Sequence, residues 1–213
     1  GVRTFKAFLS SLKLRRGDIT LDQLADVDTA SGAERVLAGG RYVGVLADQF
    51  AFMQLPIQSA KDLKKLELVD FDGDGRSFVL GQYRQYGGGG AREIVSIWEF
   101  KGDGSFRTVA AFEVAKEIGG AKLSSRWQLV PRGSLRKLAK RESKRGFDLL
   151  VEAQPPTGVD ASNWNETPAT DVHPILLPWA EEKATLYFFD GNVAQMTAPE
   201  TPKPKKKRRR RRK

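Results

Sequence analysis

Three aspartates at alternating positions have the side chains and the spacing of a calcium-binding loop. Asp70, Asp72 and Asp74 are each separated by one residue, and Gly75 occupies the sixth position of this loop. Calcium takes roughly six to eight oxygen ligands on a tightly curved segment. The alternation allows three carboxylates to face one ion, the glycine permits the sharp turn, and Arg76 offers its backbone carbonyl at the seventh position. We therefore predict a weak calcium site formed by Asp70, Asp72, Asp74 and Arg76.

The same pattern is also typical of a turn that binds no metal. In Asp/Gly-rich turns the aspartate side chains accept hydrogen bonds from nearby backbone amides. A related segment with Asp26 and Asp28 has Ala30 where a third aspartate would stand, which makes it a poorer candidate. A bound calcium and a metal-free turn both stay open for the 70–75 loop.

The acidic loop leads into the clearest β region of the sequence. Residues 78–86 and 93–100 are rich in β-branched and aromatic residues, and the glycine-rich YGGGGA separates them. A KGDG turn then leads into 105–112, so these runs predict an antiparallel meander. Residues 113–119 are interpreted as a single helical turn. Further strands are predicted at 35–37, 42–46, 49–57, 127–130, 147–153, 186–189 and 193–196.

The two ends of the chain differ from this β region. Apolar residues at positions 5, 8, 9 and 12 have helical spacing and predict one short amphipathic helix within residues 3–15. Residues 154–174 are rich in proline and predict a long surface loop. The fold class is therefore mainly β: an antiparallel meander or propeller-like domain over residues 1–197, followed by a disordered basic tail over 198–213.

A weak internal repeat accompanies the acidic loops. Residues 24–40 (LADVDTASGAERVLAGG) and 68–82 (LVDFDGDGRSFVLGQ) share an apolar residue, Asp-x-Asp, a glycine and Val-Leu in the same order. Asp26 and Asp70 are forty-four residues apart, a period typical of one propeller blade. A third copy without an acidic loop would end at 146–152.

The segment VDFDGDGRSFVL, followed by a predicted strand, resembles the FG-GAP/VCBS-type calcium-loop repeats of secreted and cell-surface β-propeller-like proteins. The resemblance covers residues 66–82 well and 24–40 poorly. It implies calcium as a structural ion, a binding or structural role, and a secreted, periplasmic or cell-envelope location. Such loops carry an acid at the ninth position, where this chain has Phe78, and Gly81 stands at the twelfth. Calcium affinity should therefore be weak, roughly 10⁻⁴ to 10⁻³ M.

A polybasic tail carries the net charge of the protein. Residues 203–213 read KPKKKRRRRRK, and their ten positive charges equal the net charge of the whole chain, so residues 1–202 are neutral overall. A second basic cluster lies between Arg132 and Arg145. Dense charge without a fixed fold attracts phosphates, anionic lipids or other polyanions in a nonspecific, salt-sensitive way. The residues predicted to contact polyanions are Lys203, Lys205, Lys206, Lys207, Arg208, Arg209, Arg210, Arg211, Arg212, Lys213, Arg136, Lys137, Lys140 and Arg141.

No set of residues in the sequence predicts catalysis. The chain has no cysteine, which excludes disulfides, thiolate catalysis and cysteine-based zinc sites. His173 is the only histidine and is predicted to be structural. The glycines at 87–90 precede a strand pattern rather than a helix, so they predict a hairpin loop and not a phosphate cradle. Trp98 and Trp127 fall in strand patterns and are predicted to be core residues.

The function predicted from the sequence is that of a noncatalytic secreted or envelope-located β binding or structural domain, which weak calcium binding would stabilise. In this reading the tail tethers the domain to a polyanionic surface or another envelope protein. One alternative is an intracellular protein whose tail binds nucleic acid nonspecifically. Another is a hydrolase that acts on an extracellular polymer. No apolar run approaches the roughly eighteen residues of a membrane-spanning helix, and a chain that starts at Gly1 agrees with removal of an upstream signal.

Overall fold

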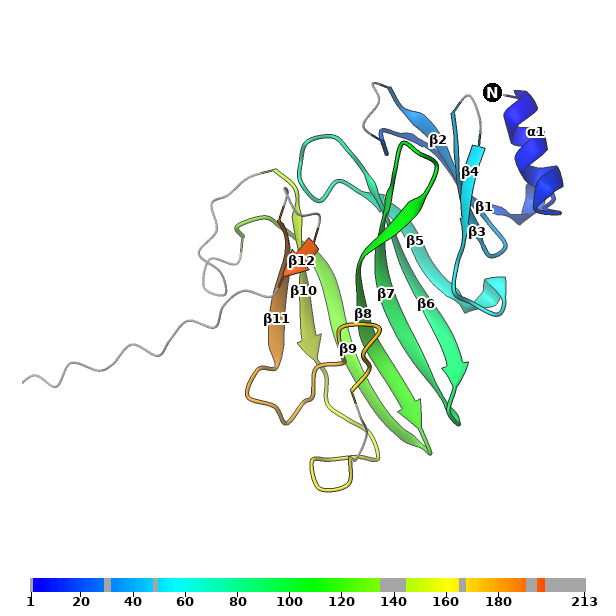
Figure 1. Cartoon of the computed structure of the whole chain (residues 1–213). Helices are drawn as coiled ribbons and strands as arrows, with labels where there is room; N and C mark the ends of the chain where they lie inside the picture. Colours follow the sequence, from blue (N-terminus) through cyan, green and yellow to red (C-terminus); the bar gives the residue numbers. More distant parts are fainter. Residues whose placement is uncertain are drawn as a thin grey trace, which may run out of the picture.

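A computed structural model describes residues 2–28, 32–47, 50–134, 145–164, 168–190 and 195–197. It is mainly antiparallel β with one N-terminal α-helix, as predicted (Figure 1). In the described residues no helix is long and apolar enough to cross a membrane. The helices are α1 (Val2–Ser11) and two short 3-10 turns, η1 (Arg16–Asp18) and η2 (Ala60–Asp62). The strands are β1 (Ile19–Ala25), β2 (Glu34–Gly39), β3 (Tyr42–Leu46), β4 (Phe50–Gln54), β5 (Leu63–Val69), β6 (Phe78–Gly87), β7 (Gly90–Phe100), β8 (Phe106–Ile118), β9 (Ala121–Pro131), β10 (Phe147–Ala153), β11 (Ala184–Asp190) and β12 (Gln195–Thr197).

The strands form two sheets in which neighbours in sequence are neighbours in space. β1 to β4 form a four-stranded sheet, and β5 to β12 form an eight-stranded sheet. β8 and β9 pair only between residues 115–118 and 121–124, close to their connecting turn. Away from this turn the larger sheet splays into β5–β8 and β9–β12, so the protein consists of three four-stranded layers (Figure 1).

The middle layer, β5–β8, is buried on both faces because its residues alternate between two cores. Phe78 and Leu80 of β6 pack with residues of β10 and β11, including Leu149. Val79 faces the opposite way and packs with residues of β2 and β3, including Val36. This double burial explains why 78–86 and 93–100 have the strongest apolar patterns in the sequence.

The outer face of the first layer is covered by α1. Phe8 of the helix is fully buried against Leu37 and Leu46, and Phe5 and Leu9 pack around it. The predicted helix is confirmed, although it ends at Ser11 rather than at residue 15. The helix therefore shields the face that the first layer does not turn toward the middle layer.

The first and second layers begin as copies of one unit. β1 and β5 start forty-four residues apart, and so do β2 and β6. A 3-10 turn precedes both β1 and β5, and its last residue caps it in each case. Asp18 accepts a hydrogen bond from the amide of Arg15 (2.7 Å), and Asp62 accepts one from the amide of Ser59 (2.8 Å). The forty-four-residue period seen in the sequence is therefore a structural repeat.

Two features differ from the sequence expectations. The sequence patterns do not predict β1 and β5 as strands, because each is an edge strand whose exposed positions, apart from Leu24, carry charged or polar residues. The helical turn predicted at 113–119 is wrong: β8 continues to Ile118, because Ala115–Ile118 pair with β9 through a tight turn at Gly119.

Candidate functional site

The carboxylates of the 70–75 loop are engaged by backbone amides of the same loop. Asp70 accepts hydrogen bonds from the amides of Gly73 (2.6 Å) and Gly75 (2.9 Å). Asp74 accepts one from the amide of Arg76 (2.9 Å). These are the bonds of an Asp/Gly turn, which satisfies its own amides without an ion.

The third carboxylate, Asp72, faces a buried arginine. Arg132 donates hydrogen bonds to the carbonyl of Phe71 (2.7 Å) and to Asp72 (3.1 Å), and its side chain is only 7% exposed. Its Nε atom lies 3.8 Å from the buried carboxylate of Asp148. The guanidinium thus brings a fixed positive charge to the carboxylate that a calcium loop would turn toward its ion. Burial raises the pKa of Asp72, and the bond from Arg132 opposes that rise.

The fourth predicted residue, Arg76, directs its side chain out of the loop. It donates to Glu99 on β7 (2.9 Å), a carboxylate that also accepts from Arg107 on β8 (2.6 Å). The predicted set therefore divides: Asp70 and Asp74 bind local amides, Asp72 binds Arg132, and the Arg76 side chain joins a separate ion-pair network.

The equivalent loop of the first layer has a different arrangement of acids. Asp26, Asp28 and Glu34 each place one carboxylate oxygen within 4.8 Å of the others. Glu34 is 8% exposed, and one of its oxygens accepts a hydrogen bond from the amide of Val27 (3.1 Å). The Oδ1 atom of Asp26 is buried and has no hydrogen-bond partner among the described residues. Three acids thus converge, and one of them has a buried oxygen without a donor among the described residues.

The sequence carries a signal for this cluster at the ninth position of the loop, which a comparison of the aspartates alone does not include. Counted from Asp26 as the first position, Glu34 stands at the ninth, which is the position where the 70–75 loop has Phe78. The closing acid therefore belongs to the loop that had looked poorer. The two loops also touch, since the amide of Ser77 donates to the carbonyl of Asp26 (2.6 Å).

The predicted polyanion-binding residues, in the tail and at positions 136, 137, 140 and 141, lie outside the described residues. Two flanking members of the basic cluster are described. Arg132 is an internal residue, as shown above, and does not belong to a basic surface. Arg145 is the last residue of the cluster, and its backbone lies in close contact with Gly73 of the acidic loop.

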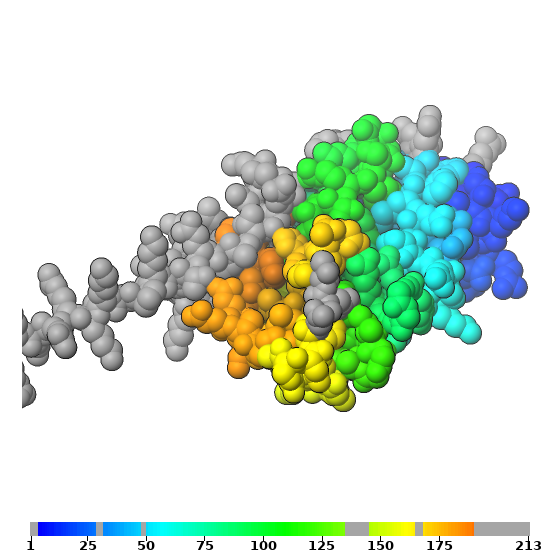
Figure 2. Space-filling model, turned by 60° about the horizontal axis from the view of Figure 1, so that its bottom comes forward, coloured from blue at the N-terminus to red at the C-terminus, as the bar shows by residue number. Residues whose placement is uncertain are grey.

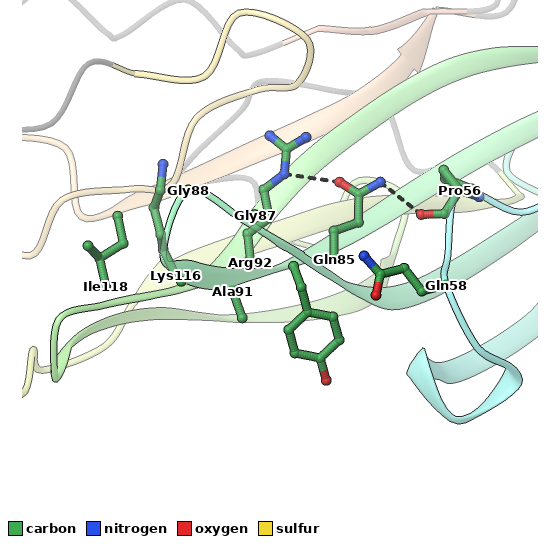
Figure 3. Close-up of a pocket in the computed structure, with 11 residues that line it drawn as sticks. Pro56, Gln58, Gln85, Gly87, Gly88, Ala91, Arg92, Lys116 and Ile118 are labelled. Atoms are coloured by element: carbon green, nitrogen blue, oxygen red, sulfur yellow. Dashed lines mark hydrogen bonds between the residues drawn. The ribbon is translucent and has the colours of Figure 1, made fainter.

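A cleft of about 540 Å³ lies at the tip of the β6–β7 hairpin. Figure 3 shows Gln85 between Arg92 and Pro56: it accepts from Arg92 (3.0 Å) and donates to the Pro56 carbonyl (2.9 Å). Arg92 also binds Asp171, and Lys116 lies 3.4 Å from buried Glu113. Both cations of the lining are thus paired with an acid, so the cleft offers an ordered polar wall.

The hairpin tips that frame this cleft are tight glycine turns. Gly88 and Gly89 both have positive φ and connect the paired residues Gly87 and Gly90. The predicted hairpin is confirmed. On the same end of the molecule, residues 154–164 lie against the β8–β9 turn, where Thr157 and Lys122 exchange backbone hydrogen bonds of 2.8 and 2.9 Å (Figure 2).

The other residues considered for chemistry have packing roles. His173 stacks on Phe112 (ring centroids 4.9 Å apart), and desolvation lowers the pKa of its imidazole. Trp98 is 6% exposed in the core, as predicted. Trp127 is partly buried against the other core, and its indole donates to Gln82 (3.1 Å).

Comparison of the chain with protein-family models, curated proteins and solved structures found no significant match. Function is therefore inferred from the geometry of the site.

Proposed function

We propose that this protein is a noncatalytic, secreted or envelope-located β binding domain that a calcium ion stabilises. The ion would be held by Asp26, Asp28 and Glu34, and the polybasic tail would tether the domain to an anionic surface. The observation that carries the proposal is the convergence of these three carboxylates, one of which, Asp26, has a buried Oδ1 without a hydrogen-bond partner among the described residues.

The chemistry of the donor set suits calcium. The three groups are hard oxygen donors, which calcium prefers. A buried carboxylate oxygen without a partner costs free energy, and a divalent cation would offset that cost together with the repulsion among the acids. Backbone carbonyls and water would complete the shell. The likeness of residues 66–82 to calcium-loop repeats supports the same ion, although here it is transferred to the equivalent loop of the first layer.

The site would stabilise the domain rather than take part in a reaction. It lies in the loop between β1 and β2 and touches the corresponding loop of the second layer through Ser77. A cation bound there would hold the first two layers at their contact. Binding of partners would then fall to the surfaces of the layers and to the tail.

Thermal unfolding with and without calcium tests this proposal. Calcium at ten times its dissociation constant should stabilise the folded state by about 1.4 kcal/mol, which raises the melting temperature by about 3–6 °C. The shift should disappear in Glu34→Gln and persist in Asp72→Asn, whose carboxylate belongs to the other loop. An unchanged melting temperature at every calcium concentration would refute the stabilising role.

A further inference from the structure

The edge strands of the two sheets are not equally protected against pairing with another strand. β1 has a register shift between Ile19 and Leu21 and an exposed ion pair from Asp22, and β5 has a shift near its start and three charged residues. Bulges and charges of this kind are how natural sheets prevent edge-to-edge association. β4 has neither: its sequence is FAFMQ, and its pairing with β3 is regular over all five residues.

The hydrogen-bonding groups of β4 that face away from the sheet can be identified from the ladder. The amide of Leu55 donates to the carbonyl of Arg41 (2.7 Å), in register with the β3–β4 pairs. Bonded and non-bonded pairs alternate in an antiparallel ladder. The odd-numbered residues of β4 are therefore bonded to β3, and Phe50, Phe52 and Gln54 direct their N–H and C=O groups toward the open edge.

The same even-numbered residues form an aromatic surface on the outer face of the sheet. Phe50 contacts Phe8 of α1 (ring centroids 5.9 Å apart), and Phe52 contacts both Phe50 (6.3 Å) and Tyr42 (5.9 Å). Phe52 is nevertheless 44% exposed. An aromatic ring thus stands at the centre of an uncharged strand whose outward backbone groups have no partner strand in the part of the chain that the structure describes.

We propose that β4 pairs with β4 of a second copy of this chain, so that the two first layers form one continuous eight-stranded antiparallel sheet. The two-fold axis would pass beside Phe52, which would lie opposite Phe52 of the second copy. Phe50 would then lie opposite Gln54, and the outward N–H and C=O groups of all three residues would be bonded across the axis.

A second copy fits this edge better than a charged peptide does. The strand carries no charge, so an antiparallel pair with itself has no like charges in opposition, and it places one aromatic ring against another. The fourth strand of the second layer already pairs with a further strand at its outer edge. β8, the fourth strand of the second layer, extends its sheet through Ala115–Ile118 to β9, whereas β4, the fourth strand of the first layer, has no such neighbour.

Sedimentation velocity over a hundredfold range of protein concentration, up to about 10⁻⁴ M, tests this pairing. The sedimentation coefficient should rise from that of a monomer to that of a dimer and then stop, because an isologous pair leaves no free β4 edge. Phe52→Lys places two ammonium groups in opposition and should raise the dissociation constant about tenfold or more. A chain that stays monomeric throughout the range, or grows beyond a dimer, would overturn the proposal.

Leu24→Lys is the matched control, since Leu24 is 74% exposed on the protected edge strand β1. It should leave the dimer unchanged, and loss of dimer in both variants would mean that a general gain of charge, not the β4 edge, is responsible. Melting curves at low concentration show whether Phe52→Lys folds. Crosslinking supplies independent evidence: the chain has no cysteine, so Phe52→Cys should react with a short bifunctional maleimide to give a covalent dimer, and Leu24→Cys should not.

Discussion

Arg132 donates a hydrogen bond of 3.1 Å to Asp72, across sixty residues of sequence. This contact places a positive side chain inside the loop whose composition most suggests a calcium site. The equivalent loop of the first layer instead brings Asp26 and Glu34 together, and the buried Oδ1 of Asp26 has no hydrogen-bond partner among the described residues. The two copies of the repeat thus balance their carboxylates in different ways: the second through a built-in guanidinium and the first, we propose, through a bound ion.

Removal of the built-in cation should be costly. Arg132→Met leaves the buried acceptors of Phe71 and Asp72 unsatisfied, and breaking a buried ion pair costs about 3–5 kcal/mol. Denaturant unfolding should show a loss of that order. Arg126→Met is the control: Arg126 binds Glu152 but is 63% exposed, and an exposed pair contributes about 0–1 kcal/mol. Equal losses in the two variants would contradict an internal role for Arg132.

The N-terminal helix should be an integral part of the first layer. Phe8→Ala empties a fully buried position between α1 and the sheet, and such truncations cost about 3–5 kcal/mol. Lys6→Ala, at an exposed position of the same helix, should change the free energy of unfolding by less than about 0.5 kcal/mol. A small effect of Phe8→Ala would show that α1 contributes little to the fold.

The single histidine makes the pH dependence of stability simple to follow. Desolvation lowers the pKa of His173 in the folded state below its ordinary value near 6.5. The unfolded chain therefore binds the proton more tightly, so the contribution of His173 to stability is full above about pH 6.5 and is lost as pH falls through the folded pKa. His173→Phe should abolish this component, and NMR titration of the one imidazole should give the lowered pKa directly. A value at or above 6.5 would contradict it.

The tail should act independently of the fold. Deletion of residues 203–213 removes ten positive charges and should abolish retention on anionic vesicles without changing the melting temperature. If all ten charges meet phosphates, the logarithm of the nucleic-acid binding constant should fall with the logarithm of salt concentration with a slope of about −7 to −9. Equal vesicle binding by the full and shortened chains would place the polyanion contact elsewhere.

The sequence predicted what local patterns determine and missed what depends on contacts between distant residues. The helix around Phe8 and the strands β6, β7 and β10 follow from apolar periodicity, and Gly87–Gly90 reads correctly as a hairpin. The partner of Asp72 could not be predicted, because Arg132 looks like one more member of a basic surface cluster until the fold buries it. Glu34 could be predicted from the sequence, because it stands at the ninth position counted from Asp26; the missing third aspartate at Ala30 hides that signal.

Calcium titration of the full chain by isothermal calorimetry tests the central claim most directly. The account predicts one site per chain, lost in Asp26→Asn and Glu34→Gln and retained in Asp72→Asn, with a dissociation constant at the weak end of roughly 10⁻⁴ to 10⁻³ M. If the heat of calcium binding vanished in Asp72→Asn but survived in Asp26→Asn, the 70–75 loop would bind the ion, and the site proposed at Asp26 and Glu34 would be wrong. No calcium binding by the unaltered protein would contradict the account.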